Sequence, residues 1–245
     1  MTMKCPIEHA KSYPFDIPDG SFVLGRDGWQ KIRAAEADET VIENRHAVIA
    51  SGSNASPTRL ADKYVDHGHL LDDPIYATRA VMFDFDTVYS AHFSRYGSIP
   101  ATLAHAPGAA ADVFVTWLTD GQLERMHETE SIGINYDFTH LFGIELTIRG
   151  KGHLDNAHAY LSRKGCLTKD GAPVPLAEIN TEGRRWAPMS QEEVLDYTRS
   201  LIDPHADSDT FIKTGVSSPA RRKQRTQALE KYALPHGWHS LIFKS

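Results

Sequence analysis

The sequence predicts an α+β fold in which a small, closed or nearly closed mixed sheet carries helices on one side. Between residues 46 and 162, short apolar runs and segments of alternating apolar and polar residues outnumber amphipathic helical stretches. Strands with so few long helices between them argue against repeated βαβ units. Beyond residue 165, two capping signals each open an amphipathic stretch, which predicts a helical C-terminal extension.

Length, charge and cysteine content limit the class of protein. The 245 residues suffice for one large domain or a domain with a sizeable appendage. With 26 basic and 32 acidic side chains, the net charge of −6 favours a soluble protein that binds no nucleic acid. Cys5 and Cys166 lack the CxxC spacing and favour a reducing cytoplasm, although the sequence leaves a pair between them open. Without an apolar signal segment or a run of about eighteen apolar residues, we expect neither export nor a membrane span.

The chain divides into three parts at about residues 45 and 165. Residues 1–45 predict an N-terminal extension with one short helix around residues 29–35. Residues 47–49 predict a buried strand that ends in a loop of small residues, 51–55. Ser56 followed by Pro57 then predicts a helix that runs to about Tyr64.

Further strands and one helix complete the predicted barrel of residues 46–165. Strands are expected within residues 75–89 and at 112–118, 144–148 and 157–161, with a turn at Pro107-Gly108. Thr119 and Gln122 have the spacing of a capping box and predict a helix directly after the strand 112–118. That helix delivers Glu130 to its C-terminal end, at a boundary with a loop.

The C-terminal extension, residues 166–245, contains two clear helix starts. Ser190 with Glu193 makes a capping box, and Ser218-Pro219 opens a second helix. Residues 203–217 between them are rich in Asp, Ser and Thr, which predicts a mobile linker. We expect the two helices to pack over the mouth of the barrel and to narrow the range of substrates.

The order of these features over residues 46–165 resembles the γ-glutamylcyclotransferase-like superfamily, whose members include the ChaC-like branch. That family has a first strand ending in Tyr-Gly-Ser-Asn or Tyr-Gly-Ser-Leu, a Gly-x-Pro-Ala-Thr-like segment, a strand, a helix with Leu-Asp-x-x-Glu-Gly, a nearby Tyr and a late strand with a Tyr. The corresponding segments here are Ser51-Gly52-Ser53-Asn54, residues 97–102, the strand 112–118, residues 126–131, Tyr136 and residues 157–161 with Tyr160.

Three departures from the family pattern bear on the substrate. Ser51 stands where the family has Tyr, Met126-His127 replaces Leu-Asp, and Ser131 replaces the Gly after the acid. A serine in place of a ring predicts a larger, wetter pocket and a bulkier or more polar substrate. Tyr96-Gly97-Ser98 spells the loop motif better, but it has no apolar strand before it and no helix start after it, so we assign it to the downstream segment.

The resemblance implies a cyclotransferase reaction without metal or organic cofactor. In the family, the α-amine of a γ-glutamyl amide attacks its own γ-carbonyl, which closes 5-oxoproline and releases an amine. Glu130 then corresponds to the general acid/base that takes a proton from the attacking amine and returns one to the leaving amine. The substrate would be a small molecule with a carboxylate and an amide; the oligomeric state stays open.

The predicted binding residues surround this acid. Backbone N–H groups of Gly52, Ser53, Asn54 and Ala55 would form an anion nest at a helix start, with Ser51 at its rim. Tyr136 and Tyr160 could hydrogen-bond the substrate or orient Glu130, or they could be core residues with a hydroxyl at the rim.

Other interpretations of the sequence remain as alternatives. The same barrel could be a non-catalytic metabolite-binding module, or an amide hydrolase in which Glu130 activates water. The residues His67, His69, Asp72 and Asp73 could ligate a divalent metal, although a polar loop explains them as well. The basic run 221–225 could contact phosphate, but a solvated helix face is the preferred interpretation. No Gly-x-Ser-x-Gly elbow is present, and Gly25-Arg26-Asp27-Gly28 is neither a phosphate loop nor a dinucleotide fingerprint.

Overall fold

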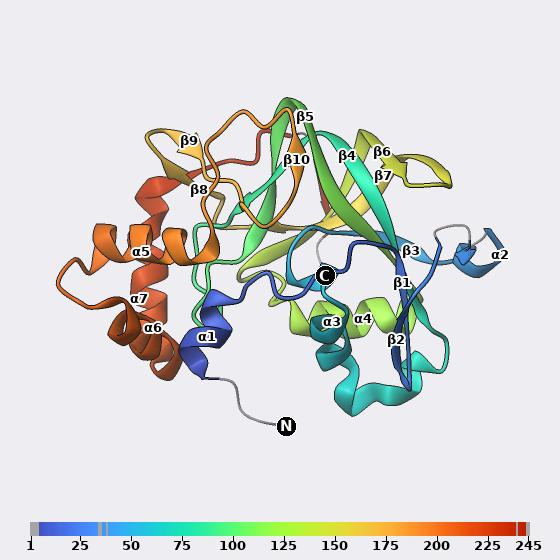
Figure 1. Cartoon of the computed structure of the whole chain (residues 1–245), viewed down its shortest axis with the longest axis horizontal. Coiled ribbons are helices and arrows are strands. Elements are labelled where there is room, and N and C mark those ends of the chain that lie inside the picture. Colours follow the sequence, from blue (N-terminus) through green and yellow to red (C-terminus); the bar gives the residue numbers. More distant parts are fainter. Residues whose placement is uncertain (1–4, 34–35, 38, 239, 244–245) are drawn as a thin grey trace.

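A computed structural model describes residues 5–33, 36–37, 39–238 and 240–243, and its centre is a closed five-stranded barrel (Figure 1). The strands pair in the ring β5-β3-β7-β6-β4, and β4 pairs with β5 to close it. Only β3 and β7 run parallel; the other pairs of the ring are antiparallel. The predicted α+β fold with a mixed barrel is therefore confirmed. The strands are β3 (His46–Ala50), β4 (Ile75–Tyr89), β5 (Ala101–Leu118), β6 (Tyr136–Ile148) and β7 (Gly152–Ser162).

Alternation along β5 divides the apolar side chains between two faces of the sheet. Val113, Val115 and Trp117 belong to one buried cluster, whereas Phe114 and Leu118 belong to another. The second cluster also holds apolar residues of α3 (Pro57–Tyr64) and α4 (Asp120–Thr129), which cover that face of the barrel (Figure 1). Both helices begin where the sequence predicts, and the capping box of Thr119 and Gln122 is present.

The turn predicted at Pro107-Gly108 is a β-bulge within the long hairpin of β4 and β5. Phe85 is opposite both His105 and Ala110, so the residues between them leave the ladder. Gly108 has a φ of +85° there, a conformation that favours glycine, and its N–H donates to Asp84 Oδ1 at 2.7 Å.

The N-terminal segment joins the barrel sheet. It contains α1 (Pro6–Lys11), β1 (Phe22–Gly25), β2 (Gly28–Lys31) and α2 (Glu39–Ile42). β1 pairs with β4 and forms a hairpin with β2, so the predicted helix around 29–35 is wrong at its start; residues 34–35 lie outside the described residues. The hairpin forms because Gly28, with a φ of +122°, permits a tight turn after Asp27.

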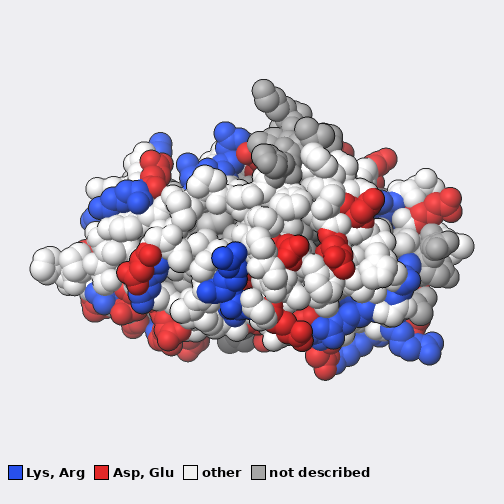
Figure 2. Space-filling model, turned by 90° about the horizontal axis from the view of Figure 1, so that it is seen from above, with Lys and Arg blue, Asp and Glu red and all other residues white. Residues whose placement is uncertain are grey.

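Charges are mixed on the face of the molecule that Figure 2 shows, where Lys and Arg lie among Asp and Glu. Cys5 is exposed, Cys166 is buried, and both are free thiols. Across the described ranges, the helices are too short or too polar for one to cross a membrane.

The C-terminal extension contains strands as well as helices. β8 (Cys166–Lys169) pairs with β9 (Ala172–Pro173) and β11 (Ala233–Leu234) in a small second sheet. β10 (Thr181–Glu182) and β12 (Ser240–Phe243) instead add to β5 and β6 of the barrel sheet.

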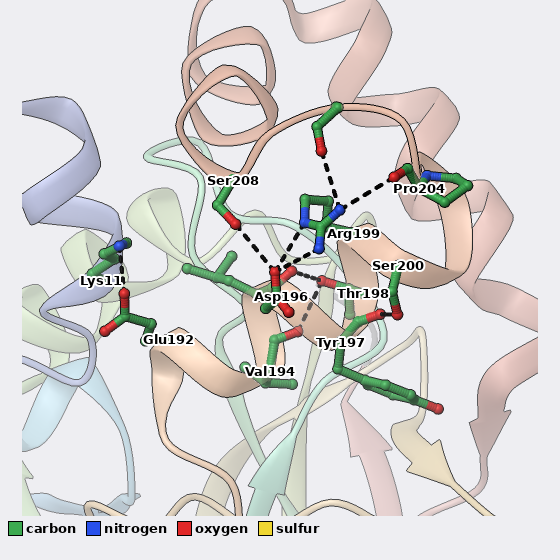
Figure 3. A network of polar contacts seen from close by, with 12 residues as sticks. Lys11, Glu192, Val194, Asp196, Tyr197, Thr198, Arg199, Ser200, Pro204 and Ser208 are labelled. Atoms are coloured by element: carbon green, nitrogen blue, oxygen red, sulfur yellow. Dashed lines mark hydrogen bonds and ion pairs between the residues drawn. The ribbon is translucent and has the colours of Figure 1, made fainter.

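The helices of the extension are α5 (Gln191–Ile202), α6 (Ser208–Ser217) and α7 (Pro219–Leu229). α5 and α7 begin at the predicted signals, but the predicted mobile linker is wrong because most of it is α6. Asp207 caps α6 by accepting from Thr210 N–H at 2.8 Å, and Phe211 and Ile212 bury its inner face. Figure 3 shows Asp196 of α5 accepting from Arg199 and from Ser208, which ties the two helices together.

Candidate active site

A cavity of about 580 Å³ opens between the end of β3, helix α3 and the C-terminal end of α4. The structure brings together nearly all of the predicted site residues in its wall: Ser51, Gly52, Ser53, Asn54, Glu130, Tyr136 and Tyr160. Ala55 is the exception, because it is buried outside the wall and its N–H donates to Gly52 O at 2.9 Å. Ala55 therefore contributes no free donor to an anion nest.

Glu130 is the C-cap of α4 and is held from two sides. Its Oε1 accepts from Asn54 Nδ2 at 2.9 Å and from Lys63 Nζ at 2.5 Å. Only 12% of the Glu130 side chain and 15% of the Lys63 side chain are exposed. The loop of β3 thus touches the predicted acid directly, although 76 residues separate Asn54 from Glu130.

Position 52 has room only for glycine, because side chains of other segments lie close to its backbone. A Cβ at this position would lie 2.3 Å from the Tyr13 hydroxyl and 2.9 Å from Ala101 Cβ. The Tyr13 hydroxyl accepts from Ala101 N–H at 2.7 Å. This hydrogen bond holds the N-terminal segment next to the loop. The loop then turns into a short 3-10 helix, Ser53–Ala55, that leads into α3.

Tyr136 and Tyr160 line the cavity with hydroxyls that already have partners. Tyr136 Oη donates to Ala101 O at 3.2 Å, and Tyr160 Oη lies 2.8 Å from His127 Nδ1. Burial raises the pKa of both phenols, and the negative charge of Glu130 adds to the effect. Both tyrosines are therefore neutral hydroxyls at physiological pH.

Several wall residues were not predicted. Arg59 and Lys63 lie four residues apart on α3, directly after the predicted loop, so that helical spacing could have identified them. Tyr13, His92 and Tyr96 come from distant segments, and no sequence pattern places them near Glu130. Tyr96 begins the second copy of the loop motif, which is not the loop at the end of β3, yet Tyr96 lies in the cavity wall.

The charged side chains of the wall are largely paired. Arg59 Nη1 contacts Asp62 Oδ2 at 2.5 Å, and Arg125 Nη1 contacts Glu128 Oε2 at 2.6 Å. The Arg59 guanidinium also lies 4.8 Å from the Phe15 ring and 5.3 Å from the Tyr96 ring. The Tyr96 ring thus borders the cavity, and the larger pocket expected from Ser51 stays a prediction.

Contrary to the expectation from the sequence, the C-terminal helices do not cover the cavity. The wall residues all come from positions 13–160, so α5–α7 supply none of them. The helices pack instead behind the wall, because a Cβ at Gly97 would lie 2.9 Å from Val216 Cγ2 of α6. They support the segment that carries Tyr96 and do not form a lid.

The rival sites have other partners. Asp72 pairs with Arg26 at 3.0 Å, Asp73 pairs with Arg45, and no metal-binding group of three or more His, Cys, Asp or Glu is found among the described residues. The interpretation of run 221–225 as a solvated helix face is wrong for Arg225. Its side chain is buried, donates to Phe211 O at 2.6 Å and lies 3.8 Å from the Phe211 ring.

Comparisons with known proteins add solved structures of similar shape. No family model matches the chain, and no curated protein matches it. A solution structure from Arabidopsis thaliana is 17% identical with a TM-score of 0.34, over 48% of this chain and 62% of that one, less than two thirds of its length. YkqA from Bacillus subtilis is 16% identical with a TM-score of 0.40, over 82% of this chain and 72% of that one. A γ-glutamyl cyclotransferase is 14% identical with a TM-score of 0.39, over 82% of this chain and 94% of that one.

One of these similar structures, the γ-glutamyl cyclotransferase, belongs to the family that the sequence resembles. At such identities and scores they carry no argument about activity, and the fold rests on the strand pairings of the barrel itself.

Proposed function

We propose that this protein is a γ-glutamylcyclotransferase-like enzyme that cleaves a γ-glutamyl amide by intramolecular amine attack. The observation that carries the proposal is the contact of Glu130 with Asn54 and Lys63 at the edge of a polar cavity. A largely buried carboxylate next to a loop of small residues supplies what the reaction needs: a proton acceptor and main-chain donors for an oxyanion.

The proton transfers follow from this arrangement. The ion pair with Lys63 holds the Glu130 carboxylate at the cavity, where it can accept a proton from the substrate. Glu130 takes a proton from the α-ammonium of the substrate, and the free amine attacks the γ-carbonyl carbon. The tetrahedral intermediate then collapses: Glu130 returns the proton to the departing nitrogen, and the C–N bond to the leaving group breaks. The second proton of the attacking nitrogen passes to the released amine, which leaves in its ammonium form. The products are 5-oxoproline and an amine.

The main chain of the loop and the Tyr13 hydroxyl stabilise the oxyanion. Gly52 brings the main chain of residues 51–54 within reach of the cavity because it has no side chain. The Tyr13 hydroxyl accepts from Ala101 N–H and retains its own proton, so it can donate to a developing negative charge.

The test is a panel of γ-glutamyl amines and peptides, with 5-oxoproline, glutamate and free amine all quantified. We expect 5-oxoproline and amine in equal amounts. Glutamate in place of 5-oxoproline would instead identify an amide hydrolase, and binding without any product would identify a metabolite-binding module.

Glu130→Gln tests the assignment of the acid within the same panel. We expect turnover to fall about 10²-fold or more, because a proton-transfer group is lost. Glu128→Gln is the matched control, since Glu128 lines the same cavity but pairs with Arg125. Turnover of a folded Glu130→Gln protein at the wild-type rate would rule out Glu130 as the acid/base.

A further inference from the structure

His92 is a buried histidine in the cavity wall that the proposed reaction does not use. It follows the end of β4, and only 2% of its surface is exposed. Its ring packs edge-on against Tyr136, with centroids 5.4 Å apart. The ring is therefore held in place beside a residue that faces the same cavity.

A chain of hydrogen bonds determines which nitrogen of His92 carries the proton. Ser90 Oγ donates its proton to Ser162 Oγ at 2.6 Å. Because a hydroxyl has one proton, Ser90 Oγ must accept in its other contact, which is with His92 Nδ1 at 2.5 Å. His92 Nδ1 is thus the N–H donor, and Nε2 carries a lone pair.

This lone pair is available to a ligand. Within the described ranges, His92 Nε2 has no hydrogen-bond partner. It is also absent from the fully buried polar atoms that lack a partner, so it is not fully buried in the cavity wall. Burial lowers the pKa of His92 to about 3, and the positive charge of Lys164 adds to the effect. The imidazole is therefore neutral at physiological pH and does not repel a cation.

Several other acceptors of the wall already have partners, although Asn54 Oδ1 has none among the described residues. Glu130, Asp62 and Glu128 each contact a cationic side chain, and Ala101 O accepts from Tyr136. The loop N–H groups can only donate, and Tyr136 already donates its proton to Ala101 O. A substrate ammonium that enters this cavity needs an acceptor, and His92 Nε2 provides one.

We infer that His92 Nε2 accepts a hydrogen bond from the α-amino group of the γ-glutamyl substrate and so selects substrates that carry this amine. The inference rests on the proposed function, because it names the group that holds the attacking nitrogen. His92 orients that nitrogen, whereas Glu130 removes its proton.

The test compares two probes and two variants. The probes are L-glutamine, the simplest γ-glutamyl amide, and glutaramate, the same molecule without the α-amino group. His92→Gln places an amide at the position of Nε2, whereas His92→Asn places one at the position of Nδ1. Binding of both probes is measured by calorimetry for each protein, with thermal unfolding to verify that the variants are folded.

We expect wild type to prefer L-glutamine by about tenfold or more, since a hydrogen bond to a charged group contributes about 1.5–3 kcal/mol. His92→Asn should lose this preference and His92→Gln should keep most of it. A preference in His92→Asn equal to that of wild type would overturn the inference, as would a wild type that shows none.

A nitrogen-15 NMR spectrum of wild type tests the tautomer without reference to activity. Protonation of His92 at Nδ1 supports the inference, and protonation at Nε2 overturns it. Failure of the proposed function is distinguishable: a preference for L-glutamine that depends on His92, without 5-oxoproline formation, retains the binding site and discards the cyclotransferase.

Discussion

The two walls of the cavity differ in how the chain builds them. One wall consists of the loop 51–54, helix α3 and the end of α4, and it contains Lys63 and Glu130. The other wall brings together Tyr13, His92 and Tyr96 from separate segments, with α6 packed behind Gly97. We call these the motif wall and the assembled wall.

The two walls are also held by different forces. In the motif wall, ion pairs and the close approach at Gly52 fix the groups that would perform the chemistry. In the assembled wall, the Tyr96 ring packs against the rings of His9 and Phe15 behind it, and the centroids of the three rings are 5.0 to 5.7 Å apart. The difference suggests that reaction type resides in the first wall and substrate selection in the second.

The largest expected effect on stability comes from the helices behind the assembled wall. Arg225→Ala removes a buried guanidinium that contacts Phe211 O and Asp203. Its loss removes this buried donor from Phe211 O and from the half-buried Asp203, so we expect the free energy of unfolding to fall by about 3 kcal/mol. Chemical denaturation measures this, with Arg221→Ala on the exposed face of α7 as the control, expected within about 0.5 kcal/mol of wild type. Equal values for the two variants would mean that α7 does not support the fold in this way.

Gly52→Ala breaks the contact between the two walls. The new methyl would overlap the Tyr13 hydroxyl, and we expect a loss of about 1–3 kcal/mol in stability together with reduced turnover. Gly68→Ala is the matched control, because a Cβ there meets nothing within 4 Å. If both variants behave alike in denaturation and turnover, the close approach at Gly52 is not needed.

Lys63→Met tests the charge that faces Glu130 in the motif wall. Without the ammonium, one hydrogen bond to the carboxylate is lost, and we expect kcat to fall about tenfold while the overall fold persists. Lys63→Arg retains the charge and should lose less. Steady-state kinetics on the best panel substrate decide this, and a kcat unchanged in Lys63→Met would make the ion pair purely structural.

The pH dependence of stability gives the smallest effect and concerns the assembled wall. His92 has a folded pKa of about 3 against an ordinary value of 6.5, so on acidification the unfolded chain takes up a proton before the native protein does. This contribution is complete above pH 6.5 and is lost as the pH falls toward 3. Between pH 6.5 and 5.5 the loss is about 1 kcal/mol. Denaturation at both pH values should show a smaller difference for His92→Gln; an identical difference would mean that His92 is not buried in its neutral form.

The sequence by itself determined the elements whose signals are local. The capping boxes at Thr119 and Ser190 are short-range hydrogen bonds, and both helices begin where those residues predict. The loop at the end of β3 and the position of Glu130 at the end of α4 also follow from periodicity and caps, and the structure places both in one cavity.

Only the tertiary structure decided the assembled wall and the support behind it. Tyr13 reaches the cavity because its hydroxyl accepts from Ala101 N–H, and His92 reaches it from the end of β4, where Tyr89 is paired with Ala101 of β5. Such contacts between distant segments leave no periodic signal in either segment. The segment 203–217 has the composition of a loop, yet it forms α6 because burial of Phe211 and Ile212 outweighs weak local propensity. Arg225 is buried for the same kind of reason: its partners, Asp203 and Phe211, are brought to it by helix packing.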